Sequence, residues 1–120
     1  FRDKEAFDVI AAKIIPELID RKKDKLRIWA AGCSTGEEAY SLVILFNEYI
    51  EANNLNCEIK CFATDIDEKA LEIAGKGLYP KSIIADLEPS ILSKYFIEKE
   101  NGYQVKEAVR KKLFLPNTIY

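Results

Sequence analysis

The chain has 120 residues, of which 48% are apolar, and this is enough for one domain with a hydrophobic core. Its formal net charge of −2 disfavours a general nucleic-acid binder, because such a protein would carry a basic face. No stretch reaches the length of a membrane span and no signal-peptide pattern opens the sequence, so we predict no membrane insertion.

The first predicted element is a helix over residues 3–22, where apolar side chains recur at helical spacing. Pro16 lies inside this pattern and is expected to kink or split the helix near Ile15. The chain opens with Phe1-Arg2-Asp3 and without an initiator methionine, from which we expect a trimmed or partly ordered start. A solvated, lysine-rich connection is expected at residues 21–25.

Residues 26–31 form a near-continuous apolar run, which predicts a strand covered on both faces. A second helix is predicted over residues 37–53, with an apolar stripe that faces the core. The members of that stripe are Ala39, Leu42, Val43, Phe46, Tyr49 and Ile50. Trp29 and Tyr40 are interpreted as core contacts between the sheet and the helix.

The next predicted strand, residues 57–64, alternates in polarity, so Cys57 and Cys61 face the same side. A zinc site would need two further ligands, and the chain has three cysteines and no histidine. We therefore predict no metal site and expect reduced, half-buried thiols, as in intracellular proteins. Asp67 or its neighbour is expected to open a third helix that ends at residues 75–77.

The sequence of the last part of the chain, from residue 79 on, predicts shorter elements. Tyr79-Pro80 marks a turn, and Tyr79 is interpreted as a packing residue. Pro89 lies in the first turn of a short helix, and residues 96–105 are typical of a hairpin. Residues 113–115 form the last strand. Because βαβ crossovers are right-handed, we predict that this strand and the two earlier ones form a parallel sheet with helices on both faces.

A loop of small residues, Gly32-Cys33-Ser34-Thr35-Gly36, joins the first strand to the second helix, and the second strand ends in an acid. This order is typical of the front half of a nucleotide-binding βαβ unit. The loop lacks both the Gly-x-Gly-x-x-Gly spacing of a dinucleotide fingerprint and the lysine of a P-loop. Glu37 and Glu38 at the helix start would repel an anion and favour a cation. They would equally complement the helix dipole, and the residues alone leave both roles open.

Asp65 lies at the carboxyl end of the second strand, and in open α/β sheets ligands bind outside the carboxyl ends of the strands. An acid there can accept hydrogen bonds from both hydroxyls of a ribose. The alternative is that Asp65 caps the third helix, a role that Asp67 fills equally well. We favour Asp65 on the ligand and Asp67 as the cap.

Two stretches, Ala-Ala-Gly-Cys-Ser-Thr-Gly-Glu-Glu-Ala-Tyr-Ser at residues 30–41 and Ala-Thr-Asp-Ile-Asp at residues 63–67, resemble the CheR family. Its members are S-adenosylmethionine-dependent methyltransferases that esterify glutamates on chemotaxis receptors, and the resemblance covers nearly the whole chain. It implies an α/β, Rossmann-like class I methyltransferase fold, with S-adenosylmethionine as cofactor and S-adenosylhomocysteine as product. It also implies a cytoplasmic enzyme whose partner is the receptor's cytoplasmic domain. The cofactor carries an ammonium and a sulfonium but no phosphate, which agrees with the two acids at the helix start.

The resemblance implies Gly32, Glu38 and Asp65 as cofactor-binding residues. The start of the chain is similar to the end of the family motif Thr-x-x-Phe-Phe-Arg, whose arginine lies by the methyl-transfer centre. Arg2 is therefore implied as a catalytic and cofactor-binding residue. A guanidinium can clamp a carboxylate in two parallel hydrogen bonds, and an ionised glutamate needs no general base, so the reaction does not require histidine.

The resemblance also implies a contact at the end of the chain. Family members carry an asparagine four residues after the phenylalanine of the last strand, where it touches the adenine end of the cofactor. That position is Thr118 here, and Asn117 stands one step earlier. Either residue is implied as the contact.

The family's N-terminal helical domain and its Cys-Arg-Asn segment have no counterpart here, so residues 1–120 are expected to form the front part of a methyltransferase domain. We expect such a part to bind cofactor weakly, to be inactive alone, and either to self-associate through an exposed sheet edge or to fray there. One alternative is a non-catalytic CheR-like module that binds cofactor or protein within a signalling protein. Another is an unrelated Rossmann-like dehydrogenase fragment, which the missing fingerprint disfavours.

Overall fold

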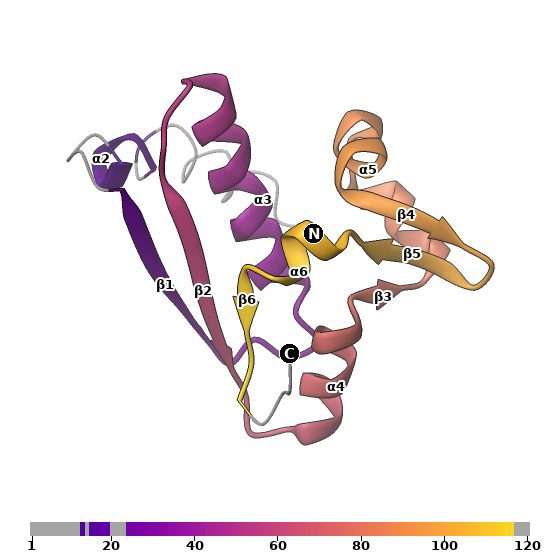
Figure 1. The fold of residues 1–120 in the computed structure, drawn as a ribbon. Coiled ribbons are helices and arrows are strands. Elements are labelled where there is room, and N and C mark those ends of the chain that lie inside the picture. Colours follow the sequence, from indigo (N-terminus) through magenta and orange to yellow (C-terminus); the bar gives the residue numbers. More distant parts are fainter. Residues whose placement is uncertain (1–12, 14, 20–23, 117–120) are drawn as a thin grey trace.

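The computed structural model describes residues 13, 15–19 and 24–116, and within these ranges the strands form two three-stranded sheets (Figure 1). The first sheet is parallel, with the order β1-β2-β6. Its strands are β1 (Lys25–Ala31), β2 (Glu58–Thr64) and β6 (Leu113–Phe114). The second sheet is antiparallel, with the order β3-β5-β4. Its strands are β3 (Leu78–Tyr79), β4 (Phe96–Lys99) and β5 (Gly102–Val105).

Helices connect these strands. The helices are α2 (Ile15–Ile19), α3 (Glu37–Ala52), α4 (Glu68–Lys76), the 3-10 helix η2 (Lys81–Asp86), α5 (Pro89–Tyr95) and α6 (Glu107–Arg110). Of these, α3, α4 and α5 lie where the sequence predicts helices. Pro89 is the first residue of α5, where its missing N–H leaves no helical hydrogen bond unmade. Helix α2 begins at Ile15, with Pro16 in its first turn, whereas most of the helix predicted over residues 3–22 lies outside the described residues, so the kink or split near Ile15 stays a prediction. The short elements β3, η2 and α6 were not predicted.

The parallel pairing of the first sheet is confirmed. Leu26 pairs with Ile59 and Ala31 pairs with Thr64 along β1 and β2, while Leu113 of β6 pairs with Cys61. Because the strands run in the same direction, the carboxyl ends of β1 and β2 meet at one edge of the sheet. The residues that follow them, Gly32 and Asp65, therefore start from neighbouring positions.

In the part of the chain that the structure describes, the parallel sheet is covered on one face. Ile15 of α2 and Phe46 of α3 pack in one cluster with Leu26 and Ile59. Side chains alternate along a strand, so Trp29 points to the opposite face, where it is 71% exposed. The expectation of a first strand covered on both faces, and of Trp29 in the core, is wrong because an apolar run does not reveal which faces have a covering layer. Tyr40, by contrast, is 1% exposed and belongs to the core as predicted.

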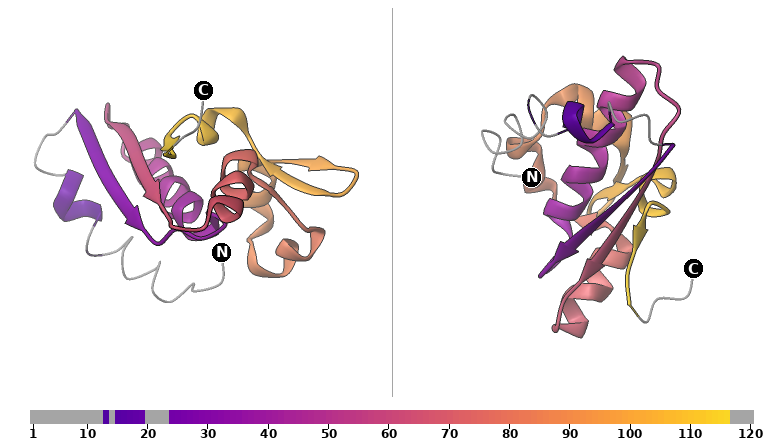
Figure 2. Two further views of the ribbon diagram at one scale, coloured as in Figure 1. Left: turned by 90° about the horizontal axis from the view of Figure 1, so that it is seen from below. Right: turned by 90° about the vertical axis from the view of Figure 1, so that its left-hand side faces the viewer.

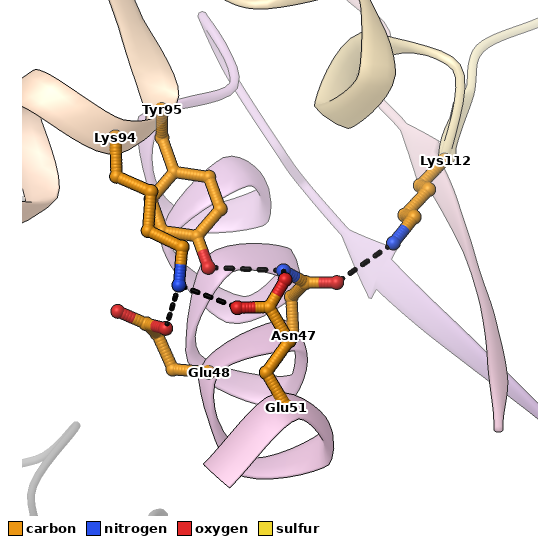
Figure 3. Close-up of polar contacts among 6 residues, drawn as sticks. All are labelled: Asn47, Glu48, Glu51, Lys94, Tyr95 and Lys112. Carbon is orange, nitrogen blue, oxygen red and sulfur yellow. Dashed lines mark hydrogen bonds and ion pairs between the residues drawn. The ribbon is translucent and has the colours of Figure 1, made fainter. Parts of the chain in front are cut away.

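The antiparallel sheet stands apart from the parallel one, with α3 and α4 between them (Figures 1 and 2). A polar network joins α5 to α3 on this side (Figure 3). The Nζ of Lys94 lies 2.7 Å from Glu48 Oε2 and also contacts Glu51. Asn47 Nδ2 donates to the hydroxyl of Tyr95 over 2.9 Å. The predicted hairpin of β4 and β5 is confirmed, and this network holds the adjoining helix against α3.

The three cysteines are free thiols, as expected, but of the three only Cys57 is half-buried. Cys33 and Cys61 are buried, and burial raises the pKa of Cys61 to about 11, so this thiol stays protonated at neutral pH. Over the described ranges, no three His, Cys, Asp or Glu side chains gather as a metal would require. Over the same ranges, we find no helix with the length and apolarity needed to cross a membrane.

Candidate functional site

The small-residue loop lies at the carboxyl edge of the parallel sheet and is tied to the end of β2. The backbone N–H of Cys33 donates to the carbonyl of Thr64 over 2.9 Å. The next N–H, that of Ser34, donates to Asp65 Oδ2 over 2.8 Å. Ser34 adopts a left-handed backbone conformation with φ of 51°, and Gly32 and Gly36 adopt φ of 67° and 94°. The loop is therefore a tight, defined turn in which the N–H groups of Cys33 and Ser34 face the end of β2, while the N–H of Gly36 donates to the Cys33 carbonyl.

Both carboxylate oxygens of Asp65 accept backbone hydrogen bonds. Oδ1 accepts from the N–H of Asp67 over 2.9 Å, and Oδ2 accepts from Ser34. These bonds, first from Asp67 and then from Ser34, hold the pKa of Asp65 below its ordinary value, so the group is ionised at neutral pH. A carboxylate oxygen has two lone pairs. Each oxygen therefore retains one acceptor position, which is enough for two neighbouring hydroxyls of a ligand.

Asp67 caps α4, as predicted. Its Oδ1 accepts from the N–H groups of Lys69 at 3.0 Å and Ala70 at 3.3 Å. The helix ends at Gly77, which adopts the left-handed conformation that favours glycine at this position. The two acids of this segment thus differ in role, since Asp65 faces the loop and Asp67 faces the helix.

Replacing Asp67 with alanine is expected to lower the free energy of unfolding by about 1 kcal/mol, because the first turn of α4 loses its side-chain acceptor. Urea unfolding followed by circular dichroism measures the change. Asp67→Asn is the matched control and should retain most of the stability, since its amide oxygen can still accept. Equal stability of the alanine variant and the parent would show that water replaces the cap without cost.

The two acids at the start of α3 are in different environments. Glu37 accepts a hydrogen bond from the Thr35 hydroxyl, and the hydroxyl of Ser41 donates to the Glu37 carbonyl over 2.8 Å. The side chain of Glu38 is exposed, and this side chain forms no hydrogen bond or ion pair with a residue that the structure describes. Glu37 is thus hydrogen-bonded to the loop, while the side chain of Glu38 is exposed in the first turn of α3.

Helix α4 packs directly against the end of the loop at Gly36. A Cβ atom built on Gly36 would lie 2.8 Å from the Cβ of Ala74 and 3.2 Å from the hydroxyl oxygen of Tyr79. A Cβ on Gly32, by contrast, would meet no atom within 4 Å. The two glycines therefore have different reasons for their place. Gly36 leaves room for the close packing of α4, whereas Gly32 faces open space beside Asp65.

Tyr79 connects the antiparallel sheet to the loop. It is 3% exposed, which confirms its interpretation as a packing residue, and its ring meets that of Tyr40 edge to face at 6.3 Å. Its hydroxyl also donates to the carbonyl of Thr35 over 2.8 Å, a contact that the sequence did not predict. No local pattern indicates a bond between residues so far apart in the chain. Burial raises the pKa of Tyr79, so the phenol remains a donor.

The structure brings some of the predicted site residues together. Gly32 and Asp65 lie at the same edge of the sheet, and Glu38 follows in the first turn of α3. Arg2, Asn117 and Thr118 lie outside the described residues, so their roles stay predictions. A pocket of about 270 Å³ lies between α3, α5 and α6, and none of these predicted residues lines it. The prediction that Gly32, Glu38 and Asp65 line one pocket also stays a prediction.

Comparisons with known proteins agree on one family. The family model for the CheR methyltransferase, SAM binding domain, matches residues 1–115. A chemotaxis protein methyltransferase of Borreliella burgdorferi is 36% identical over 119 residues, which are 95% of this chain and 42% of that protein. Chemotaxis protein methyltransferase 1 of Pseudomonas aeruginosa is 36% identical over 118 residues, covering 94% of this chain and 43% of that protein.

A chemotaxis protein methyltransferase of Listeria innocua is 33% identical over 111 residues, covering 92% of this chain and 41% of that protein. The chain therefore matches these proteins along nearly its whole length. It spans only 41 to 43% of the length of these three relatives.

Proposed function

We propose, because this chain belongs to the CheR methyltransferase family, that it supplies the S-adenosylmethionine-binding part of an enzyme that forms glutamyl methyl esters on chemotaxis receptors. The observation that carries the proposal is the carboxylate of Asp65, which the loop holds ionised at the carboxyl edge of the sheet. This edge is where parallel α/β sheets bind nucleotides, and an acid there suits a ribose. The names of the relatives support the chemotaxis setting.

The donor set of the site fits S-adenosylmethionine rather than a phosphate-bearing nucleotide. Asp65 retains two acceptor positions for the ribose hydroxyls. Glu38 is exposed in the first turn of α3 and would attract the ammonium group at the amino acid end of the cofactor. The open space beside Gly32 would let the backbone approach the cofactor closely, since no Cβ stands in the way. The bound cofactor supplies the methyl group of the reaction.

The remaining proposed roles concern residues outside the described ranges. Arg2 would hold a carboxylate through paired hydrogen bonds and so orient it near the methyl-transfer centre. Asn117 or Thr118 would contact the adenine end. The methyl acceptor, a glutamate on the receptor's cytoplasmic domain, is already ionised at neutral pH and needs no base. We also propose a cytoplasmic location, and that residues 1–120 are part of a methyltransferase domain, in line with their share of the relatives' length.

Calorimetric titration of the chain tests the cofactor assignment. S-adenosylmethionine and S-adenosylhomocysteine are expected to bind, and NAD is expected to give no heat of binding, because the loop has no phosphate-binding fingerprint. Urea unfolding of the same sample confirms that the protein is folded. Preferential binding of NAD, or no binding of S-adenosylhomocysteine to the folded chain, would contradict the proposal.

A chimera tests the reaction. In it, this chain replaces the matching 119 residues of the Borreliella burgdorferi relative. Incubation with methyl-labelled S-adenosylmethionine and a receptor cytoplasmic fragment is expected to place base-labile label on receptor glutamates. The parent relative is the positive control. A folded chimera that binds S-adenosylhomocysteine but transfers no label would contradict the proposed reaction.

A further inference from the structure

Tyr79 lies on β3, outside the sheet that carries the loop, yet its hydroxyl reaches the loop backbone. We propose that Tyr79 is a positioning residue for the cofactor site, which holds the carbonyl of Thr35 and so fixes the loop in the conformation that presents Ser34 to Asp65. The inference rests on the proposed function, because it assigns to the loop a role in cofactor binding. It adds to that function a residue that the sequence indicated only as a packing residue.

Three consecutive loop residues are each anchored by a different group. Cys33 donates to the Thr64 carbonyl at 2.9 Å, and Ser34 donates to Asp65 Oδ2 at 2.8 Å. Thr35 accepts from the Tyr79 hydroxyl at 2.8 Å. The first two acceptors, the Thr64 carbonyl and the Asp65 carboxylate, lie at the carboxyl end of β2, at the edge of the sheet proposed to bind the cofactor. The third is the only one of these three that comes from the antiparallel sheet.

The Thr35 carbonyl depends on Tyr79 because the helix does not use it. The backbone hydrogen bonds of α3 begin one residue later, where the N–H of Tyr40 donates to the carbonyl of Gly36 over 2.9 Å. Within the described part of the chain, the Tyr79 hydroxyl is the hydrogen-bond donor to the Thr35 carbonyl. A carbonyl left without a donor next to a packed helix carries a desolvation penalty. Without Tyr79, the Thr35–Gly36 peptide group would therefore turn toward water. Its Gly36 N–H, which donates to the Cys33 carbonyl over 3.0 Å, would move with it and so disturb the Cys33–Ser34 peptide that carries the Ser34 N–H.

Tyr79 is itself held firmly, which a positioning residue requires. It pairs with Tyr103 of β5 in the antiparallel sheet. A Cβ atom on Gly102 would lie only 2.0 Å from the Tyr79 carbonyl oxygen, so β5 packs against the backbone of Tyr79 without a gap. The Tyr40 ring stands against the Tyr79 ring. The hydroxyl therefore has little freedom to follow a moving loop, and it constrains the loop instead.

The test is Tyr79→Phe, which keeps the ring and removes the hydroxyl. The affinity for S-adenosylhomocysteine is expected to fall roughly three- to tenfold, the range that corresponds to losing one net hydrogen bond. The amide N–H groups of Ser34 and Gly36 are expected to exchange with deuterium faster in the variant without ligand, because the loop opens more often.

Tyr95→Phe is the matched control. Tyr95 is 4% exposed, against 3% for Tyr79, and its hydroxyl is also hydrogen-bonded, accepting from Asn47 at 2.9 Å. The Tyr95 variant should lose comparable stability while its cofactor affinity and loop exchange stay at the parent values. A purely structural role for Tyr79 would make the two variants alike in affinity and in loop exchange, and that result would overturn the inference.

Two readouts separate this inference from the proposed function. If the parent chain bound no S-adenosylhomocysteine, the proposed function would fail, while the exchange of Ser34 and Gly36 would still show whether Tyr79 fixes the loop. If the parent bound the product and Tyr79→Phe bound it equally well, the proposed function would stand. The positioning role would then be wrong.

Discussion

Replacing Asp65 with alanine is expected to weaken the binding of S-adenosylhomocysteine by about a hundredfold, as judged from the loss of charge-assisted hydrogen bonds. Two effects combine in this variant. The ribose hydroxyls lose their acceptor, and the N–H of Ser34, which donates to Asp65 Oδ2, loses the partner that orders the loop. The change therefore removes both a ligand contact and the geometry around it. Calorimetric titration of the folded variant measures the affinity.

Two further substitutions test whether the loss of affinity comes from the carboxylate of Asp65 itself. Asp65→Asn keeps one carbonyl oxygen as acceptor, so its affinity should lie between those of the parent and the alanine variant. Asp67→Ala removes only the cap of α4 and should leave the affinity unchanged, although stability falls. Unchanged affinity in Asp65→Ala would mean that Asp65 orders the backbone and does not contact the cofactor.

Replacing Gly36 with alanine is expected to lower the free energy of unfolding by about 2–4 kcal/mol, from left-handed strain and overpacking together. The new Cβ would lie 2.8 Å from the Cβ of Ala74 and 3.2 Å from its Cα, so the α4 backbone would have to move. Gly36 also has φ of 94°, a conformation that alanine rarely adopts. Urea unfolding measures the loss.

Gly32→Ala is the control that separates strain from crowding. Gly32 has φ of 67°, but a Cβ there would meet no atom within 4 Å. Its alanine variant should lose only about 1 kcal/mol, from the left-handed backbone alone. Adding Ala74→Gly to the Gly36→Ala variant should recover part of the lost stability, because it removes the atom in the closest contact. Equal losses at the two glycines would show that the approach of α4 has no energetic role.

Local patterns in the sequence predicted the elements that carry the site. The alternation through Ile59, Cys61 and Ala63 identifies β2, and these three side chains are buried as that alternation requires. Asp67 precedes an amphipathic helix and caps it. The order of strand, loop and helix then places Gly32 and Asp65 at one edge, because parallel strands bring their carboxyl ends together.

What the sequence could not predict depends on contacts between distant parts of the chain. Trp29 lies in an apolar run, but its exposure depends on whether a layer packs on its face, which local spacing does not encode. The bond from Tyr79 to Thr35 joins positions 44 residues apart and depends on how the antiparallel sheet is placed. Strand β3 has two residues, too few for any period to be visible.

The antiparallel sheet lies entirely within the connection between two neighbouring parallel strands, β2 and β6. This connection, residues 65–112, is roughly twice as long as the one between β1 and β2, yet doubling a connection adds only about 0.6 kcal/mol of loop-closure entropy. An insertion of this size therefore costs the parallel sheet little, provided that it packs its own apolar surface. The antiparallel sheet can therefore change in length or sequence while the edge formed by the loop and Asp65 stays intact, except at Tyr79, which bonds to the loop. Helix α4 lies in the same connection and is constrained separately, by its packing against Gly36.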